Sequence, residues 1–239
     1  FVIMIIDVFT TCYNEEIILP YFLRHYKEFA RNITVYDNMS TDNSLKILEE
    51  SGVKIIPFNT NEQYDEQTLI RNKSWKSSDA DWVIVCDVDE FIYHKDFVEV
   101  LSKTDSTLIT PNGYEMMSEE LPTTDGQIYG EIKNGFFKKN YSKPCVFKPS
   151  EISNINFGPG SHFATPDGNV VDKGDLDIKL LHYKFINREK LIKQYNIMGN
   201  RQSNDSIIKG FGNEYKDWDI NFINKQFDEW LINSTNIID

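Results

Sequence analysis

Residues 82–93 read WVIVCDVDEFIY, in which an apolar run ends abruptly in acidic residues. Four apolar residues at 83–86 are typical of a buried strand, and the carboxylates of Asp87, Asp89 and Glu90 follow them. In an extended backbone, side chains two residues apart point to the same side, so Asp87 and Asp89 can face one point in space. Two carboxylates held that close need a cation, and their hard oxygen ligands suit Mg²⁺ or Mn²⁺. The stretch therefore predicts a strand end that binds a divalent metal ion and, through it, a diphosphate.

Strand-like and helix-like segments alternate over the first ninety residues. This alternation predicts the α/β class, with a Rossmann-like, mostly parallel sheet and helices on both of its faces. Ligands bind such sheets beyond the carboxyl ends of the strands, near the point where the strand order reverses. We therefore expect the polar residues that follow the strands to meet at one edge of the sheet. These residues are Asn14, Glu15, Asp37, Ser40, Asp42, Asp87, Asp89 and Glu90.

Composition and charge narrow the class of protein. A formal net charge of −12 argues against nucleic acid or an anionic membrane surface as the main partner. No apolar run is long enough to cross a bilayer, so we expect no transmembrane segment in this chain. The three cysteines form no CxxC pair, which predicts buried, reduced thiols and, together with the absence of a signal peptide, favours the cytoplasm. The chain begins at Phe1 rather than at methionine, as expected for a piece of a longer polypeptide.

Two common phosphate-binding motifs are missing from the sequence. It contains neither a GxGxxG after the first expected strand nor a GxxxxGK[ST], which disfavours a Rossmann dinucleotide site and a P-loop. A phosphate group must then be held through the metal ion.

Four motifs in a fixed order resemble a known family. They are TCYNEEIILPYFLRHY, VYDNMSTDNS, RN and DWVIVCDVDEF, and together they resemble the family 2 type of GT-A glycosyltransferases, most closely its bacterial and viral branch. The resemblance covers most of residues 5–95. The later motifs KPCVFKPS, GPGSHFA and LLHYKF look similar to the less regular second half of that branch. The resemblance implies one GT-A domain over residues 1–239, with a nucleotide-sugar-binding half at 1–95 and an acceptor-binding and closing half at 96–239.

The same resemblance implies an activity. The chain would be a metal-dependent enzyme of the hexosyltransferase class that works in glycan biosynthesis. It would transfer a sugar from a nucleoside diphosphate sugar, with UDP as the favoured nucleotide, to a hydroxyl group of a glycan, lipid-linked or protein-linked acceptor. Inversion at the anomeric carbon is implied, with Mn²⁺ or Mg²⁺ as the cofactor. The metal and nearby lysine or arginine charge would stabilise the departing diphosphate.

The resemblance also places the nucleoside. Thr11 and Glu15 lie where such enzymes hold the nucleoside, and Asp37 lies where a carboxylate accepts a hydrogen bond from the base. Arg71, in the RN pair, resembles the position that approaches ribose or phosphate.

The implied metal site uses both aspartates of the DxD motif. Asp87 matches the first carboxylate, which commonly faces ribose or metal-bound water, and Asp89 matches the direct and catalytically essential metal ligand. A later histidine often completes the metal shell in GT-A enzymes. His182 is the first choice for this ligand and His162 the second, and an imidazole ligand would favour Mn²⁺ over Mg²⁺.

An inverting enzyme also needs a carboxylate base within hydrogen-bond reach of the acceptor hydroxyl. The usual Glu-Asp signature is not evident, and four candidates stay open: Glu115, Asp125, Asp175 and Glu214. Glu115 is preferred because it follows the strand that comes next in the sequence.

Two alternatives to the transferase remain. A sugar- or nucleotide-binding module without turnover is compatible with the missing base signature, although the intact Asp87 and Asp89 pair argues against it. A phosphohydrolase of the haloacid dehalogenase type also uses DxD after an apolar strand, with the first Asp as nucleophile. Such enzymes have Thr or Val two residues after the second Asp, where this chain has Phe91.

Overall fold

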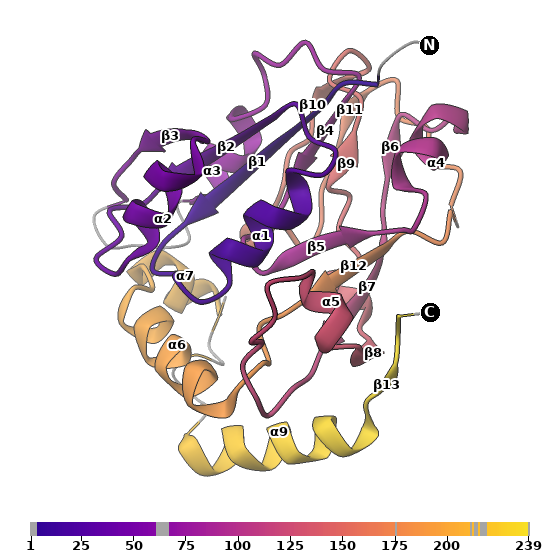
Figure 1. Cartoon of the computed structure of the whole chain (residues 1–239). Helices are drawn as coiled ribbons and strands as arrows, with labels where there is room; N and C mark the ends of the chain where they lie inside the picture. The colour runs from indigo at the N-terminus through magenta and orange to yellow at the C-terminus, as the bar shows by residue number, and fades with distance from the viewer. Residues whose placement is uncertain are drawn as a thin grey trace.

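In the computed structural model, which describes residues 4–60, 67–174, 176–210, 212, 215 and 219–238, a six-stranded sheet forms the first half of the fold (Figure 1). The first four of its strands in spatial order are parallel, and the last two continue it in antiparallel fashion. In spatial order the strands are β3 (Lys54–Pro57), β2 (Asn32–Asp37), β1 (Ile6–Cys12), β4 (Trp82–Val85), β9 (Val146–Phe147) and β6 (Leu108–Ile109).

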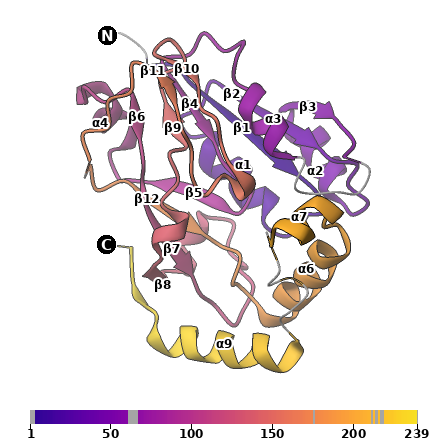
Figure 2. The same ribbon diagram turned by 180° about the vertical axis from the view of Figure 1, so that it is seen from behind.

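Helices cover both faces of this sheet. Helices α1 (Leu19–Tyr26) and α2 (Ser44–Ser51) pack on one face, where Phe22 and Leu48 share a hydrophobic core with Val8 of β1. Helix α3 (Gln67–Lys73) lies on the other face, as the two opposite views in Figures 1 and 2 show, and Trp75 just beyond it packs against the reverse side of β1 and β4. In the strand order β3-β2-β1-β4, the chain adds β2 and β3 on one side of β1 and β4 on the other side. The strand order thus reverses between β1 and β4, which is where such sheets bind ligands. The predicted Rossmann-like sheet with helices on both faces is confirmed.

Local sequence signals set several boundaries of these elements. Pro20 stands in the first turn of α1, where its missing N–H costs no helical hydrogen bond. Gly52 ends α2 with φ of +72°, a left-handed conformation that favours glycine. Asp42 lies one residue before the N-cap of α2 and accepts a hydrogen bond from the backbone N–H of Ser44 at 2.9 Å.

A second, five-stranded sheet carries the less regular half of the fold. Its strand β12 pairs in parallel with β7 and antiparallel with β5, and the register sets His182 opposite Glu115 on one side and Glu90 on the other. Three residues that are far apart in the sequence thus lie in one row across the sheet. In spatial order the strands are β13 (Thr235–Asn236), β8 (Asn134–Phe137), β7 (Asn112–Met116), β12 (Lys179–His182) and β5 (Glu90–Tyr93).

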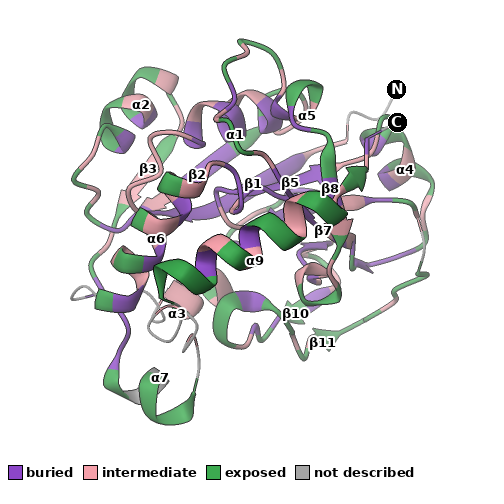
Figure 3. Cartoon of the chain, turned by 90° about the horizontal axis from the view of Figure 1, so that it is seen from below, coloured by how far each residue is buried: buried purple, intermediate pink, exposed green. Residues whose placement is uncertain are grey.

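Among the described residues, the helices that follow β12 are α6 (Arg188–Asn200), α7 (Asn204–Lys209) and α9 (Ile220–Asn233). Phe185, Leu191 and Phe227 form a separate hydrophobic core between α6, α9 and the end of β12. Figure 3 shows a buried stripe along α9 with an exposed outer face. None of the helices within the described ranges has the length and apolar character needed to span a bilayer. The remaining elements are α4 (Phe97–Lys103), α5 (Ile128–Glu131), β10 (Ile152–Asn154), β11 (Asp167–Gly168) and two single 3-10 turns, Lys139–Tyr141 and Pro159–Ser161.

The fully buried side chain of Tyr26 ties α1 to the turn that carries the DxD motif. Its hydroxyl donates to the carbonyl oxygen of Glu90 at 2.9 Å and accepts from the backbone N–H of Ile92 at 3.1 Å. The start of β5, directly after Asp89, is therefore fixed by a helix of the first half.

We expect Tyr26→Phe to lower the free energy of unfolding by about 1–3 kcal/mol, because it leaves the buried N–H of Ile92 without this acceptor. Urea unfolding followed by circular dichroism measures the change. Tyr36→Phe is the matched control, since the Tyr36 hydroxyl lies 3.5 Å from the carbonyl oxygen of Ser74, and it should stay within about 0.5 kcal/mol of the wild type. Equal losses in both variants would contradict a specific role for Tyr26.

Candidate functional site

A cavity of about 640 Å³ lies at the carboxyl ends of β1 and β4, where the strand order of the first sheet reverses. Both sheets and the C-terminal helices contribute to its walls. The sequence-predicted residues that line it are Thr11, Asn14, Glu15, Asp42, Arg71, Asp87, Asp89, His162 and His182. Asp37 and Glu115 are not among the lining residues.

Two cations hold the carboxylate of Asp87. Arg71 of α3 forms a close ion pair with Oδ1, and the Nζ of Lys143 lies 3.2 Å from Oδ2. Burial raises the pKa of Asp87, but the Arg71 guanidinium and the Lys143 ammonium outweigh it, so the pKa lies below its ordinary value. Asp87 is therefore a charged carboxylate whose position is set from two sides.

Glu90 stabilises the same turn through its side-chain carboxylate. Its carboxylate accepts a hydrogen bond from the backbone N–H of Asp87 at 2.9 Å and pairs with the buried ammonium group of Lys143. The neighbouring carboxylates raise the pKa of Lys143 despite the opposing effect of burial, which keeps this lysine positively charged. The third carboxylate of the DVDE stretch thus orients the first.

Asp89 faces His182 rather than the arginine. The His182 Nε2 lies 3.5 Å from Oδ2 of Asp89, and Nδ1 lies 3.0 and 3.1 Å from the two carboxylate oxygens of Glu115. The ring of Tyr141 stacks against the imidazole with 4.1 Å between centroids. Burial lowers the pKa of His182, but the carboxylates of Glu115 and Asp89 raise it by more than burial lowers it. The resulting pKa is about 9. The imidazole is therefore oriented by one carboxylate and presented to another.

The residues expected at the nucleoside surround the end of β1. The hydroxyl of Thr11 donates to Gln67 at 3.0 Å and accepts from Arg71 at 3.2 Å. Glu15 accepts a hydrogen bond from Gln194 of α6 at 3.2 Å, and burial raises the pKa of its carboxyl group to about 8. This contact links the loop after β1 to the C-terminal helices.

Two other predicted residues lie apart from the Asp89 and His182 pair. Asp37 is buried at the end of β2, where one oxygen accepts from the backbone N–H of Ser40 at 3.1 Å and the other has no partner among the described residues. His162 lines the cavity, but its Nδ1 contacts the carbonyl oxygen of Asn140 at 2.9 Å. His182, the first choice for the metal ligand, is thus the histidine placed against a DxD carboxylate.

The candidate bases have different surroundings. Glu115 is completely buried with both oxygens on His182, and Asp125 is an exposed loop residue outside the cavity lining. Asp175 and Glu214 lie outside the described residues. The identity of the base therefore stays a prediction.

Several site residues escaped the sequence analysis. Lys143 lies in the quoted KPCVFKPS motif, but nothing in the sequence shows that its ammonium group reaches Asp87 and Glu90. Lys184 stands two residues after His182 and Lys190 on α6, and both line the cavity. For Lys184 the sequence did offer a signal, because this basic residue stands close to His182, a candidate metal ligand.

The donor set of the site fits a divalent metal ion that is shared with a substrate. No group of three or more His, Cys, Asp or Glu side chains within the described part of the chain could hold a metal by itself. Asp89 and His182 offer one hard oxygen and one imidazole nitrogen side by side, and Glu115 fixes the imidazole through its other nitrogen. Mg²⁺ and similar ions are commonly held by one or two protein ligands together with substrate phosphates and water.

Comparison with solved structures finds similar chains at low identity. Residues 1–349 of S. aureus TarS give a TM-score of 0.44 at 14% identity, covering 95% of this chain and 71% of that one. The same fragment in complex with UDP gives a TM-score of 0.45 with the same identity and coverage. Glucosyl-3-phosphoglycerate synthase from Mycobacterium tuberculosis, in complex with Mn²⁺, UDP and glucosyl-3-phosphoglycerate, gives 0.33 at 19% identity, and covers 47% of this chain and 44% of that one.

Sequence comparison identifies the family. A search of curated proteins finds no match to the chain. The profile of the family described as Glycosyl transferase family 2 matches residues 7–158, which is more than half of the chain and includes all four N-terminal motifs. The chain therefore belongs to glycosyl transferase family 2 and is a glycosyltransferase with the GT-A fold.

Proposed function

We propose that the chain transfers a sugar from a nucleoside diphosphate sugar, with UDP as the nucleotide, to an acceptor hydroxyl with inversion at the anomeric carbon. The observation that carries this proposal is the position of Asp87 and Asp89 in the cavity at the strand-order reversal, each held by its own cationic or imidazole partner. In this proposal, residues 1–95 supply most of the donor site. Residues 96–239 supply the acceptor site, and they also add Lys143 and His182 to the donor site.

Asp89 and His182 are the proposed ligands of Mn²⁺ or Mg²⁺, and the imidazole favours Mn²⁺. The bound metal would offset the negative charge that develops on the departing diphosphate. Asp87 has both oxygens engaged by Arg71 and Lys143, so we assign it to the ribose or to metal-bound water rather than to direct ligation.

The charged side chains of the site are fixed before a substrate arrives. Arg71 and Lys143 are both largely buried and both contact Asp87, so these ion pairs hold their positive charges at the cavity. Preorganised charge of this kind stabilises a leaving group without a reorganisation cost during the reaction. Thr11, Glu15 and Asp37 remain the proposed nucleoside contacts.

In the proposed reaction, the acceptor oxygen forms a bond to the anomeric carbon while the bond from that carbon to the diphosphate oxygen breaks. The electron pair leaves with the nucleoside diphosphate, and the hydroxyl proton passes to a carboxylate base. Glu115 was the preferred base, but its contacts support a different role. We propose that Glu115 positions His182 by accepting from Nδ1–H, which leaves Nε2 free to bind the metal beside Asp89.

Asp89→Ala should abolish metal-dependent nucleotide binding, because it removes the carboxylate next to His182. Calorimetric titration of UDP, UDP-sugars, GDP-sugars and dTDP-sugars, with Mn²⁺ and with chelator, measures this. Wild type should bind one nucleotide class only when metal is present. Glu50→Ala, an exposed residue of α2, is the control and should bind like the wild type. Absence of nucleotide binding with every metal would refute the donor site.

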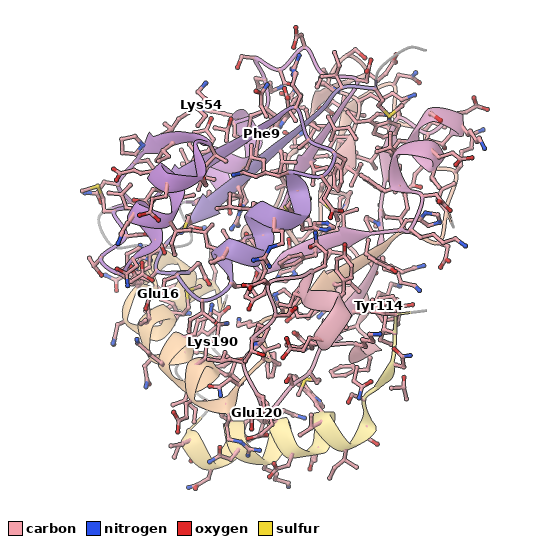
Figure 4. All side chains as sticks on the ribbon, viewed as in Figure 1. Phe9, Glu16, Lys54, Tyr114, Glu120 and Lys190 are labelled. Atoms are coloured by element: carbon pink, nitrogen blue, oxygen red, sulfur yellow. The ribbon has the colours of Figure 1, made fainter. Side chains whose placement is uncertain are left out.

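Glu115→Gln separates the positioning role from the base role. A positioning residue predicts Mn²⁺ affinity weakened by about 10- to 100-fold, with kcat recovering at saturating Mn²⁺. A general base predicts unchanged Mn²⁺ affinity and a kcat lowered by about 10²-fold or more at any metal concentration. The free Mn²⁺ signal in electron paramagnetic resonance gives the affinity, and steady-state assays give kcat. Glu120→Gln, an exposed residue a few positions along the same segment, is the control (Figure 4).

A further inference from the structure

One side of the cavity is built by the C-terminal half of the chain and differs in chemistry from the DxD side. It combines ammonium groups with aromatic rings that come from the segment before β9, the end of β12, α6 and α9. We call this surface the lysine-aromatic wall, and it consists of Lys138, Lys184, Lys190, Tyr195, Tyr215 and Trp230.

Lys184 is held in the wall by tyrosines. Its Nζ donates to the hydroxyl of Tyr215 at 2.9 Å, and it lies 4.5 Å and 5.2 Å from the ring centroids of Tyr215 and Tyr195. Within the described ranges, no carboxylate lies within ion-pair distance of this ammonium group. An ammonium group in such a setting retains its attraction for an external anion, because hydroxyls and ring faces offset only part of its charge.

Lys190 leaves a polar atom without a partner. Its Nζ is shielded from solvent and makes no hydrogen bond within the described part of the chain. The carboxylates of Glu15 and Asp89 interact with it electrostatically, but neither accepts a hydrogen bond from it. Figure 4 shows Lys190 on α6 next to the loop that carries Glu16, and Gln194 of the same helix bonds to Glu15. A buried ammonium group without a hydrogen-bond acceptor is energetically unfavourable. Lys190 is therefore well placed to bind a ligand that supplies an acceptor.

Lys138 adds a third ammonium group among rings. Its Nζ lies 4.2 Å from the ring centroid of Trp230 and 5.0 Å from that of Tyr141, the residue that stacks on His182. The wall thus reaches from the metal-binding histidine to α9. Aromatic faces beside a polar rim are surfaces on which the apolar faces of sugar rings and polyols pack.

The donor does not account for these lysines. Arg71 and Lys143 already face Asp87, and the metal proposed at Asp89 and His182 would offset the charge of the diphosphate. The three ammonium groups of the wall and that of Lys193 line the same cavity in a chain whose net charge is −12. Such a local excess of positive charge in an acidic protein indicates a second anionic group in the bound complex.

We propose that the lysine-aromatic wall binds the acceptor, and that this acceptor carries an anionic group, a phosphate or a carboxylate, next to its sugar or polyol part. Lys184 and Lys190 hold the anionic group, and the tyrosine and tryptophan rings hold the sugar or polyol. This inference rests on the proposed function, since it assumes that the DxD side of the cavity holds the nucleotide.

Calorimetric titration of inorganic phosphate into protein already saturated with UDP and Mn²⁺ tests the wall directly. The wild type should bind phosphate in the presence of the nucleotide. Lys184→Met and Lys190→Met should each weaken this binding by 10-fold or more, and two variants guard against misfolding of either one. Lys46→Met, an exposed lysine of α2, should leave it unchanged. Repeating the titration with acetate shows whether the wall prefers phosphate or carboxylate.

The outcomes separate this inference from the proposed function. Loss of phosphate binding when the wild type is saturated with UDP would assign the lysines to the donor and overturn the inference. Phosphate binding that ignores both lysine substitutions would overturn it as well. If UDP fails to bind but phosphate binds in a lysine-dependent manner, the anion site stands and the proposed donor site fails.

Discussion

The buried negative charge of Asp87 and Asp89 is the constraint on which the site depends. Both carboxylates follow a buried strand and enter a cavity with limited access to water, where an unpaired charge is strongly unfavourable. The two aspartates meet this constraint in different ways. Asp87 is neutralised by fixed cations of the protein, whereas Asp89 faces an imidazole that a metal ion can share. One motif thus provides an ion-pair cluster at Asp87 and the proposed metal position at Asp89, separated by a single residue.

The two sheets contribute different residues to the site. The first sheet brings Thr11 and Glu15, the proposed nucleoside contacts, next to the DxD motif through the reversal of its strand order. The second sheet contributes the row of Glu90, His182 and Glu115, in which each residue occupies a matching register position on adjacent strands. Because β5 begins immediately after the DxD turn, a shift of the second sheet would move Glu90, which contacts Asp87, and His182, which faces Asp89, together. Residues of both sheets therefore build the site.

The local parts of this arrangement were predictable from sequence because their signals are local. Hydrophobic alternation predicted the strands and helices up to residue 95, Gly52 the end of α2, and the DVDE stretch the position of the acidic cluster. The partners of that cluster were not predictable. Lys143 lies 56 residues from Asp87 in the sequence and Glu115 lies 67 residues from His182, and no periodicity encodes such distant contacts. His182 was selected because a later histidine often completes the metal shell in the family that the chain resembles, and its contact with Glu115 became visible only through the register of β12 and β7.

The insertion of β12 between β5 and β7 has a consequence for how the chain acquires its structure. Strands from residues 90–93 and 112–116 are not paired with each other but with a strand at 179–182, so this sheet has high contact order and its central pairing closes late. Until the chain has been synthesised beyond residue 182, β5 and β7 each present an open edge, the kind of surface that promotes association between chains. The same late strand supplies His182, the histidine that faces Asp89. Formation of the row of Glu90, His182 and Glu115 and pairing of the facing edges of β5 and β7 therefore happen in one folding event.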